Sequence, residues 1–191
     1  MLSPFVFKAF KPKSFWREVL KVKALRMWLA VLMTSIPLAG FADTDHALAA
    51  PDGPVILTVS GKIGRTNVAS EAQFDRAMLE TLPQHEFDTS TPWTEGISHY
   101  RGPLMRDLLA HLEAKSDEVH VAALNGYEAE IPVSDFEDYD VILALEKDQK
   151  AIPIREYGPL WVLYPFDQDD ALLSEKIRFR AVWQVMHIDV R

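Results

Sequence analysis

The residue types that most often carry metal or nucleophilic chemistry are missing or badly spaced in this 191-residue sequence. Cysteine is absent, which excludes disulfides, thiolate nucleophiles and thiolate metal ligands. None of the six histidines stands two or four residues from another, so the sequence predicts no histidine metal site. No P-loop, dinucleotide fingerprint or nucleophile elbow occurs. Trp93 is one binding candidate, because it follows Pro92 in a polar loop where a core role is hard to explain.

Charge is distributed unevenly along the chain. Residues 1–42 hold seven Lys/Arg and one acid, so residues 43–191 hold 13 Lys/Arg (20 − 7) and 27 Asp/Glu (28 − 1), a net charge of −14. Such an acidic domain is a poor nucleic-acid binder, because phosphate contacts need a basic face. The acid-rich run Asp135–Asp140 lacks the spacing and the glycine of a calcium loop. We predict a solvated loop there, with a docking surface as the alternative.

The stretch from residue 118 to residue 165 contains four short apolar runs separated by turn residues. Val119, Val121 and Ala123 alternate along the first run, and Asn125-Gly126 is a strong hairpin signal because both turn positions must tolerate a positive φ. The later runs cover residues 127–132, 141–145 and 160–164. None has a helical period, so we predict that the four form a sheet.

The flanking segments complete a mixed pattern. Residues 55–60 alternate as a first strand, and residues 178–190 are predicted as a last one. Ser70 and Gln73 have capping-box spacing and predict a helix that Pro83 ends. A second helix is predicted after Gly102-Pro103, with leucines on its buried side.

The N-terminal segment has the plan of a secretory signal peptide. Basic residues precede an apolar run over residues 28–40, and small residues follow it. We predict a signal peptide over residues 1–42, cleavage after Ala42 or Ala49, a flexible leader over residues 43–54 and export to the periplasm. The alternatives are an uncleaved anchor, although the run is short for a membrane span, and translation from Met27.

Several motifs carry a resemblance to a known family. Gly126-Tyr127, Ile131-Pro132-Val133, the run VILALE over residues 141–146 and the run GPLWVLYP over residues 158–165 occur in this order. Together they resemble the molybdopterin-binding domain of the sulfite oxidase family, as does the segment over residues 100–109. The resemblance covers roughly residues 55–190, a domain-sized match. It implies an α+β fold, with a mixed sheet and flanking helices.

The sequence departs from this family where its chemistry lies. In the family's molybdenum enzymes a cysteine after the first helix ligates the metal, and the matching position here is Ser90, whose neutral hydroxyl replaces a thiolate badly. Where the sulfite oxidases carry a His and an Arg, this chain has Tyr157 and Trp161. Arg155 is the positive group kept nearby for the cofactor's phosphate, and Tyr127 matches the family's active-site tyrosine.

These departures resemble a branch of small periplasmic pterin-binding proteins that lack the metal cysteine. Its members regulate a partner membrane enzyme that makes and degrades cyclic-di-GMP. A pterin is a flat heterocycle, so its recognition needs stacking rings, a carboxylate for the 2-amino/N3 edge and a few hydroxyls. The expected stacking residues are Trp93, Tyr127, Tyr157 and Trp161. The expected polar contacts come from Asp88, Ser90, Thr91 and Arg155. The ordinary alternatives are a core role for Trp161 and Trp183 and a structural role for His99.

The resulting hypothesis is an exported domain over residues 55–191 that binds a pterin as its ligand and holds no tightly bound cofactor. The expected partner is the periplasmic domain of a membrane sensor or signalling enzyme. No nucleic acid and no membrane insertion after cleavage are expected. One rival is a molybdopterin-dependent oxidoreductase with an atypical metal ligand at Ser90. The other is an interaction module without a small ligand.

Overall fold

The computed structural model describes residues 48–191, so the predicted signal peptide and residues 43–47 of the leader lie outside the described residues. No helix in the described part is long and apolar enough to cross a membrane. Residues 48–54 are tied to the domain. Leu48 is buried and its N–H donates to the Thr66 carbonyl (3.1 Å). The N–H groups of Asp52 and Gly53 donate to the Asp75 carboxylate (2.9 and 2.7 Å).

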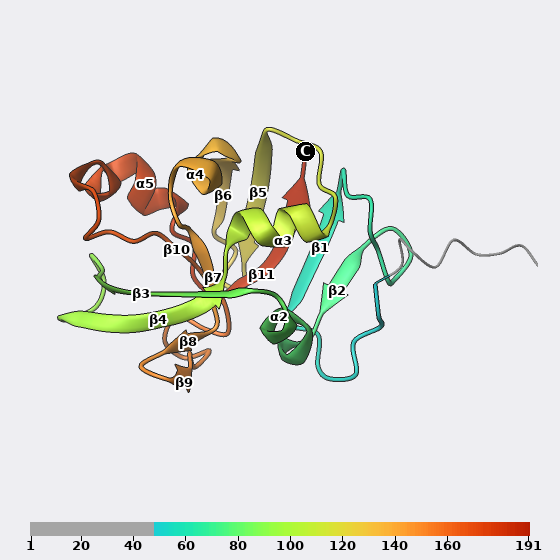
Figure 1. Cartoon of the computed structure of the whole chain (residues 1–191), viewed down its shortest axis with the longest axis horizontal. Helices are drawn as coiled ribbons and strands as arrows, with labels where there is room; N and C mark the ends of the chain where they lie inside the picture. The colour runs from blue at the N-terminus through green and yellow to red at the C-terminus, as the bar shows by residue number, and fades with distance from the viewer. Residues whose placement is uncertain (1–47) are drawn as a thin grey trace, which may run out of the picture. The chain divides into compact units, whose positions relative to one another are not determined.

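A five-stranded sheet forms one side of the domain (Figure 1). In spatial order it contains β2 (Ala72–Phe74), β1 (Leu57–Gly61), β11 (Val185–Val190), β5 (Glu118–Ala123) and β6 (Glu128–Pro132). The β1–β11 pair is parallel and the other pairs are antiparallel, so the sheet is mixed, as predicted. Gly126 has φ +81° in the turn between β5 and β6, which confirms the predicted hairpin.

The other strands make two smaller sheets. One contains β3 (Gln84–Ser90), β4 (Ile97–Pro103), β8 (Glu146–Lys147) and β9 (Lys150–Ala151). The other pairs β7 (Ile142–Ala144) with β10 (Trp161–Leu163). The single sheet predicted from residues 118–165 is therefore wrong. β7 and β10 are buried throughout, and single bridges from Ile142 to Leu104 and from Trp161 to Trp183 link them to the segments around the larger sheets.

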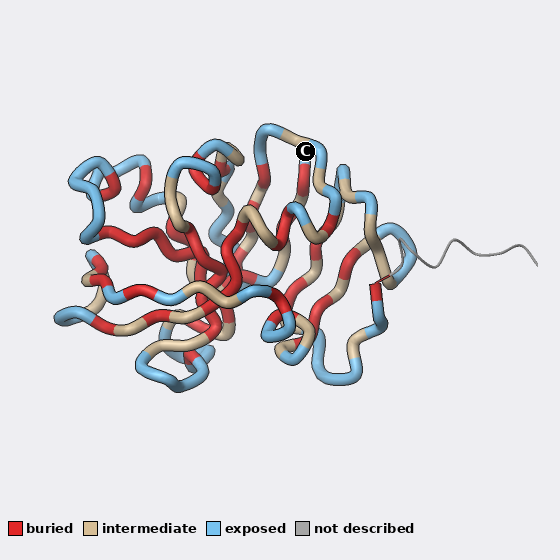
Figure 2. Tube along the Cα trace, in the orientation of Figure 1, coloured by how far each residue is buried: buried red, intermediate tan, exposed pale blue. Residues whose placement is uncertain are grey.

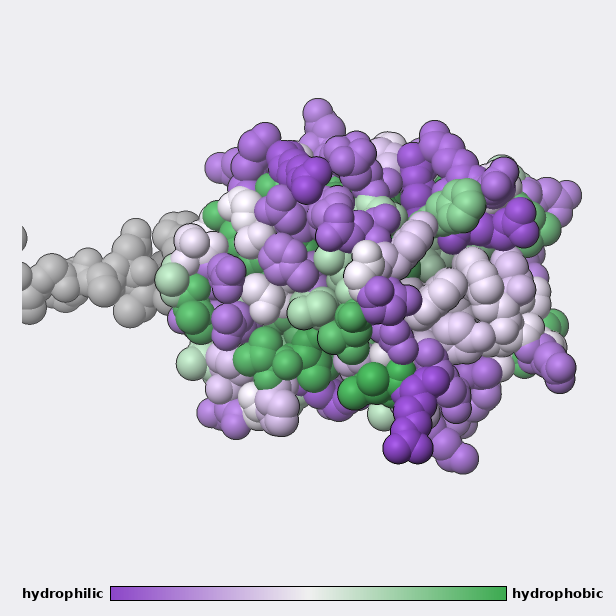
Figure 3. Space-filling model, turned by 180° about the vertical axis from the view of Figure 1, so that it is seen from behind, coloured by the Kyte–Doolittle hydropathy of each residue, from purple (hydrophilic) through white to green (hydrophobic). Residues whose placement is uncertain are grey.

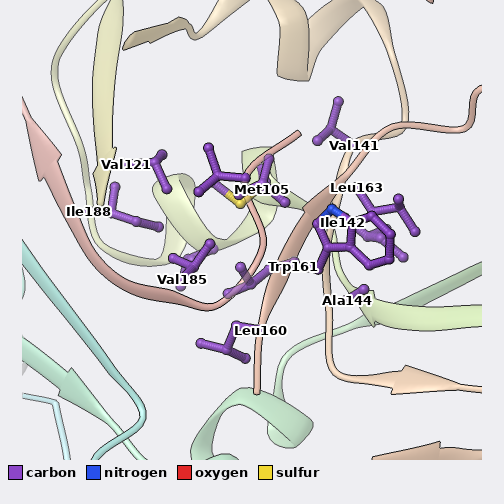
Figure 4. Close-up of a cluster of buried hydrophobic side chains, with 14 of the residues drawn as sticks. Met105, Val121, Val141, Ile142, Ala144, Leu160, Trp161, Leu163, Val185 and Ile188 are labelled. Atoms are coloured by element: carbon purple, nitrogen blue, oxygen red, sulfur yellow. The ribbon is translucent and has the colours of Figure 1, made fainter. Parts of the chain in front are cut away.

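Helices flank these sheets. They are α2 (Arg76–Thr81), α3 (Met105–His111), α4 (Ser134–Asp138), the 3-10 turn η1 (Asp170–Leu173) and α5 (Glu175–Arg180). Helix α3 crosses the five-stranded sheet, and Met105 points toward Val121 and Ile188 in the core (Figure 4). Each such fully buried side chain contributes about 1.5–3 kcal/mol. Buried positions follow the strands, while the outer turns are exposed (Figure 2).

Two predicted elements differ from the structure. The helix predicted from Ser70 begins only at Arg76, because Phe74 and its neighbours pair with β1 as a strand. Asp75 then caps the helix by accepting the Met78 N–H (2.9 Å). The strand predicted over residues 178–190 begins only at Val185, and its first residues belong to α5.

The acid-rich run is also not the solvated loop that was predicted. Residues 134–138 form α4, and Asp135 is buried where it pairs with Arg180 of α5. Figure 3 shows the face opposite to that of Figure 1, on which hydrophobic patches lie among hydrophilic residues. The large exposed apolar side chains are Val55, Val68, Ile97, Leu124, Tyr127, Ile154, Leu173, Phe179 and Met186.

Candidate functional site

A cavity of about 390 Å³ lies where α5, the β5–β6 turn and the loop after β3 meet. Its lining residues are Trp93, Asn125, Tyr127, Glu175, Arg178, Phe179, Ala181 and Trp183. We call it the aromatic cavity, because four of these eight residues carry rings. Its volume falls in the range of about 300–1,000 Å³ that is typical of small-molecule sites.

The floor of the aromatic cavity is part of a larger ring cluster. Trp93 meets Trp183 nearly edge to face, with centroids 5.2 Å apart. Behind them, Tyr157 stacks on the fully buried Trp161 at 4.6 Å and donates its hydroxyl to the Trp93 carbonyl (2.8 Å). Phe166 packs on Trp93 at 5.7 Å. These contacts hold the two tryptophans in place before any ligand arrives, which reduces the entropy cost of binding.

Tyr127 forms a wall of the aromatic cavity. It directly follows the Asn125-Gly126 turn, where its N–H donates to the Asn125 side-chain oxygen (2.9 Å). Its hydroxyl donates to the Phe179 carbonyl at 2.7 Å, near the end of α5. Burial raises the pKa of the Tyr127 hydroxyl, so this donor stays protonated at neutral pH. The hairpin and α5 are therefore tied together across one side of the cavity.

Helix α5 supplies the charged groups of the cavity. Glu175 and Arg178 stand three residues apart, and both line it. Within residues 48–191, neither side chain makes a hydrogen bond or an ion pair with the protein. One carboxylate and one guanidinium are thus free to contact a bound molecule beside the rings.

A buried ion pair holds α5 to the rest of the domain. Arg180 Nη1 lies 3.0 and 2.8 Å from the two carboxylate oxygens of Asp135, and Tyr164 donates its hydroxyl to the same carboxylate (2.8 Å). Burial and the Asp135 charge raise the pKa of Tyr164 far above its ordinary range. Tyr164 is therefore a fixed donor, and Asp135 has a partner on each side.

The structure brings together only two of the eight residues expected at the site, because Trp93 and Tyr127 line the aromatic cavity. Tyr157 and Trp161 lie in the ring cluster behind it. Arg155 is an exposed residue outside the lining. Thr91 is buried, and its hydroxyl oxygen accepts the N–H of Trp93 (3.2 Å), so it shapes the loop.

Asp88 and Ser90 have other partners. The Asp88 side chain is 70% exposed and bonds His99 Nδ1 (2.8 Å), while Glu86 lies 3.1 Å from the other ring nitrogen. These two carboxylates raise the pKa of His99, Asp88 contributing most. Ser90 donates its backbone N–H and its hydroxyl to the Asp167 carboxylate, both at 2.6 Å. Neither Asp88 nor Ser90 lines the cavity.

Comparison with known families agrees with this architecture. The family model for the oxidoreductase molybdopterin binding domain matches residues 57–166. The chain belongs to this family. The match confirms the family resemblance and the α+β fold predicted from the sequence. No curated protein matches the chain significantly. The family match includes Trp93 and Tyr127 but ends before α5 and Trp183.

A thiolate-bound metal does not fit this molybdopterin-binding domain. The chain has no cysteine, and both polar groups of Ser90 are directed at a carboxylate. A hydroxyl engaged in this way is neither a soft nor an anionic ligand. No group of three His, Cys, Asp or Glu able to hold a metal occurs among the described residues. The aromatic cavity, in contrast, suits a flat heterocycle without a metal.

Sequence reasoning missed the residues that α5 brings to the site. Arg178 and Phe179 fall at the start of the strand predicted over residues 178–190, and Glu175 lies just before it in a stretch for which no element was predicted; all three belong to α5. Trp183, for which a core role was predicted, packs against the core and also lines the cavity. The available signal was the spacing of Glu175 and Arg178, which places opposite charges on one face of a helix.

Proposed function

We propose that this molybdopterin-binding domain is a periplasmic pterin-binding protein that regulates a partner membrane enzyme of cyclic-di-GMP signalling. The observation that carries the proposal is the aromatic cavity, in which fixed rings stand beside one unpaired carboxylate and one unpaired guanidinium. A pterin needs a stacking surface and a polar contact at each edge, and this cavity offers both. The export predicted from the N-terminal sequence would put the domain in the compartment of the partner's sensor domain.

The regulatory part of the proposal requires two states of the protein with different affinities for the partner. A ligand changes an equilibrium only by its differential affinity for the two states. The proposal locates this difference at the aromatic cavity, where the lining residues Tyr127 and Phe179 are 40% and 58% exposed and so open to a partner. A bound pterin would add its own edge to this surface. The liganded and empty forms would then present different surfaces to the partner and could bind it with different affinities.

The first experiment uses the protein purified from its own periplasm. Bound small molecules are released and analysed by fluorescence and mass spectrometry, with elemental analysis for molybdenum on the same sample. We expect a stoichiometric pterin without molybdenum. Molybdenum with a phosphorylated pyranopterin would instead establish the rival oxidoreductase.

Substitutions then test the site and the signalling role. Trp93→Ala should abolish copurification of the pterin, because it removes a stacking ring and the centre of the ring cluster. Ile97→Ala is the matched control, since Ile97 is 71% exposed and lies outside the lining. Binding of the partner's periplasmic domain is measured with and without added pterin. Equal affinity in the two conditions would refute a regulatory role.

A further inference from the structure

Glu175 and Arg178 of α5 do not pair with each other. Opposite charges three or four residues apart on a helix are close enough to pair, and Arg76 and Glu80 of α2 do so at 3.2 Å. Glu175 and Arg178 stand three residues apart on α5, which also allows a pair, yet across residues 48–191 they make no ion pair with each other or with any other group. Both line the aromatic cavity.

We infer that Glu175 and Arg178 determine ligand specificity by forming hydrogen bonds with two adjacent edges of a stacked pterin ring. This inference rests on the proposed function. The Glu175 carboxylate would accept the two N–H groups of the 2-amino/N3 edge, a two-point charge-assisted contact. Arg178 would donate to the neighbouring 4-oxo and N5 acceptors, which suits its planar set of donors.

The charges of the cavity also indicate which pterins fit. Glu175 and Arg178 sum to zero, and no other charged residue is among the lining residues. A phosphate on the ligand would be repelled by the Glu175 carboxylate and by the net negative charge of the domain. Only the Arg178 guanidinium would attract it among the lining residues. The ligand class is therefore an unphosphorylated pterin, which differs from the phosphorylated pyranopterin of the molybdenum cofactor.

A matched pair of ligands isolates the role of Glu175. 6-Hydroxymethylpterin and 6-hydroxymethyllumazine have the same ring system, but lumazine replaces the 2-amino donor with an oxo acceptor. That oxo acceptor would face the Glu175 carboxylate, which is also an acceptor, so the two groups could not form a hydrogen bond and would repel each other. We expect the wild-type protein to prefer the pterin by about tenfold, the lower end for charge-assisted hydrogen bonds because both side chains are exposed.

The variants should change this preference in distinct ways. Glu175→Gln provides an amide that both donates and accepts, so it should weaken pterin binding about tenfold while lumazine binding stays equal or improves. Arg178→Gln should weaken both ligands, since both keep the 4-oxo group. The controls are Glu137→Gln and Lys176→Gln, which remove exposed charges outside the lining and should change neither affinity.

Isothermal titration calorimetry on the exported, mature protein measures all these affinities, and thermal melting confirms that each variant is folded. Equal wild-type affinity for the two ligands, or an unchanged preference in Glu175→Gln, would overturn this role in specificity while leaving pterin binding intact. If neither ligand binds the wild-type protein, the proposed function itself fails. Guanosine, which presents the same donor edge, is titrated alongside, and tighter binding than that of the pterin would overturn the ligand class.

Discussion

Replacing Arg180 with methionine should destabilise the domain strongly. The substitution keeps an unbranched apolar stem but removes the guanidinium, which leaves the Asp135 carboxylate with the Tyr164 hydroxyl as its one remaining partner. The side chains of Arg180 and Asp135 are only 14% and 11% exposed, so water compensates poorly. Removing one partner of a buried ion pair costs about 3–5 kcal/mol. A domain of this size has only about 5–15 kcal/mol of stability in total.

Urea denaturation measures this loss. With a slope of about 2 kcal/mol per molar urea, a loss of about 4 kcal/mol lowers the midpoint by about 2 M. Arg178→Met is the matched control, because it removes the same charge from the same helix at an exposed and unpaired position. Surface changes of this kind stay within about 0.5 kcal/mol.

A second substitution tests the cause of the loss. In the Arg180→Met background, Asp135→Asn removes the uncompensated charge and keeps an acceptor for Tyr164. The double variant should therefore recover much of the lost stability. A loss below about 1 kcal/mol in Arg180→Met, or no recovery in the double variant, would refute the reasoning that the cost is an unpaired buried charge.

Three further outcomes follow from other contacts. Ser90→Cys should acquire no molybdenum by elemental analysis, because the new thiol would face the Asp167 carboxylate, which disfavours a thiolate; stoichiometric metal would contradict this. The folded-state pKa of His99 is raised above 6.5, so its stabilisation is fully present below that pH and is lost as pH rises through the folded-state value. The free energy of unfolding, measured against pH, should fall by less than about 1 kcal/mol as the pH rises through the folded-state pKa of His99. This fall should be absent in His99→Gln, and an equal fall in the variant would contradict its assignment to His99. N-terminal sequencing of the exported protein should show cleavage after Ala42, because the later site would remove the buried and hydrogen-bonded Leu48; a chain lacking Leu48 would exclude this.

The sequence predicted those elements whose signals are local. The β5–β6 hairpin follows from the Asn125-Gly126 turn and the alternation around it, and the helix after Pro103 follows from its leucines. Helix α5 has no comparable signal, because Ile177 is its one buried residue. Its anchor is the pairing of Arg180 with a carboxylate 45 positions away in the sequence. A long-range contact of this kind leaves no periodic pattern in the sequence.

The same contrast between local signals and long-range contacts applies to the residues of the site. Trp93 was predicted because a tryptophan after Pro92 in a polar loop is hard to explain as a core residue, and Tyr127 was predicted because it matches the family's active-site tyrosine. Asp88 was proposed as the carboxylate of the site, but Phe87 and Thr89 are buried, so the alternation of β3 turns Asp88 to the opposite side. Glu175 lines the cavity in its place, and finding it required the position of α5.

The structure separates what holds α5 from what α5 presents to a ligand. Ile177 and Arg180 face the protein, one packed in the core and the other paired with Asp135. Glu175 and Arg178 face the cavity and bond to nothing in the described protein, so their substitution should cost little stability. The family match also ends before this helix. On the proposed function, Trp93 and Tyr127 of the matched region would supply the stacking surface, and substitution of the two free charges of α5 would change the ligand without disturbing the fold.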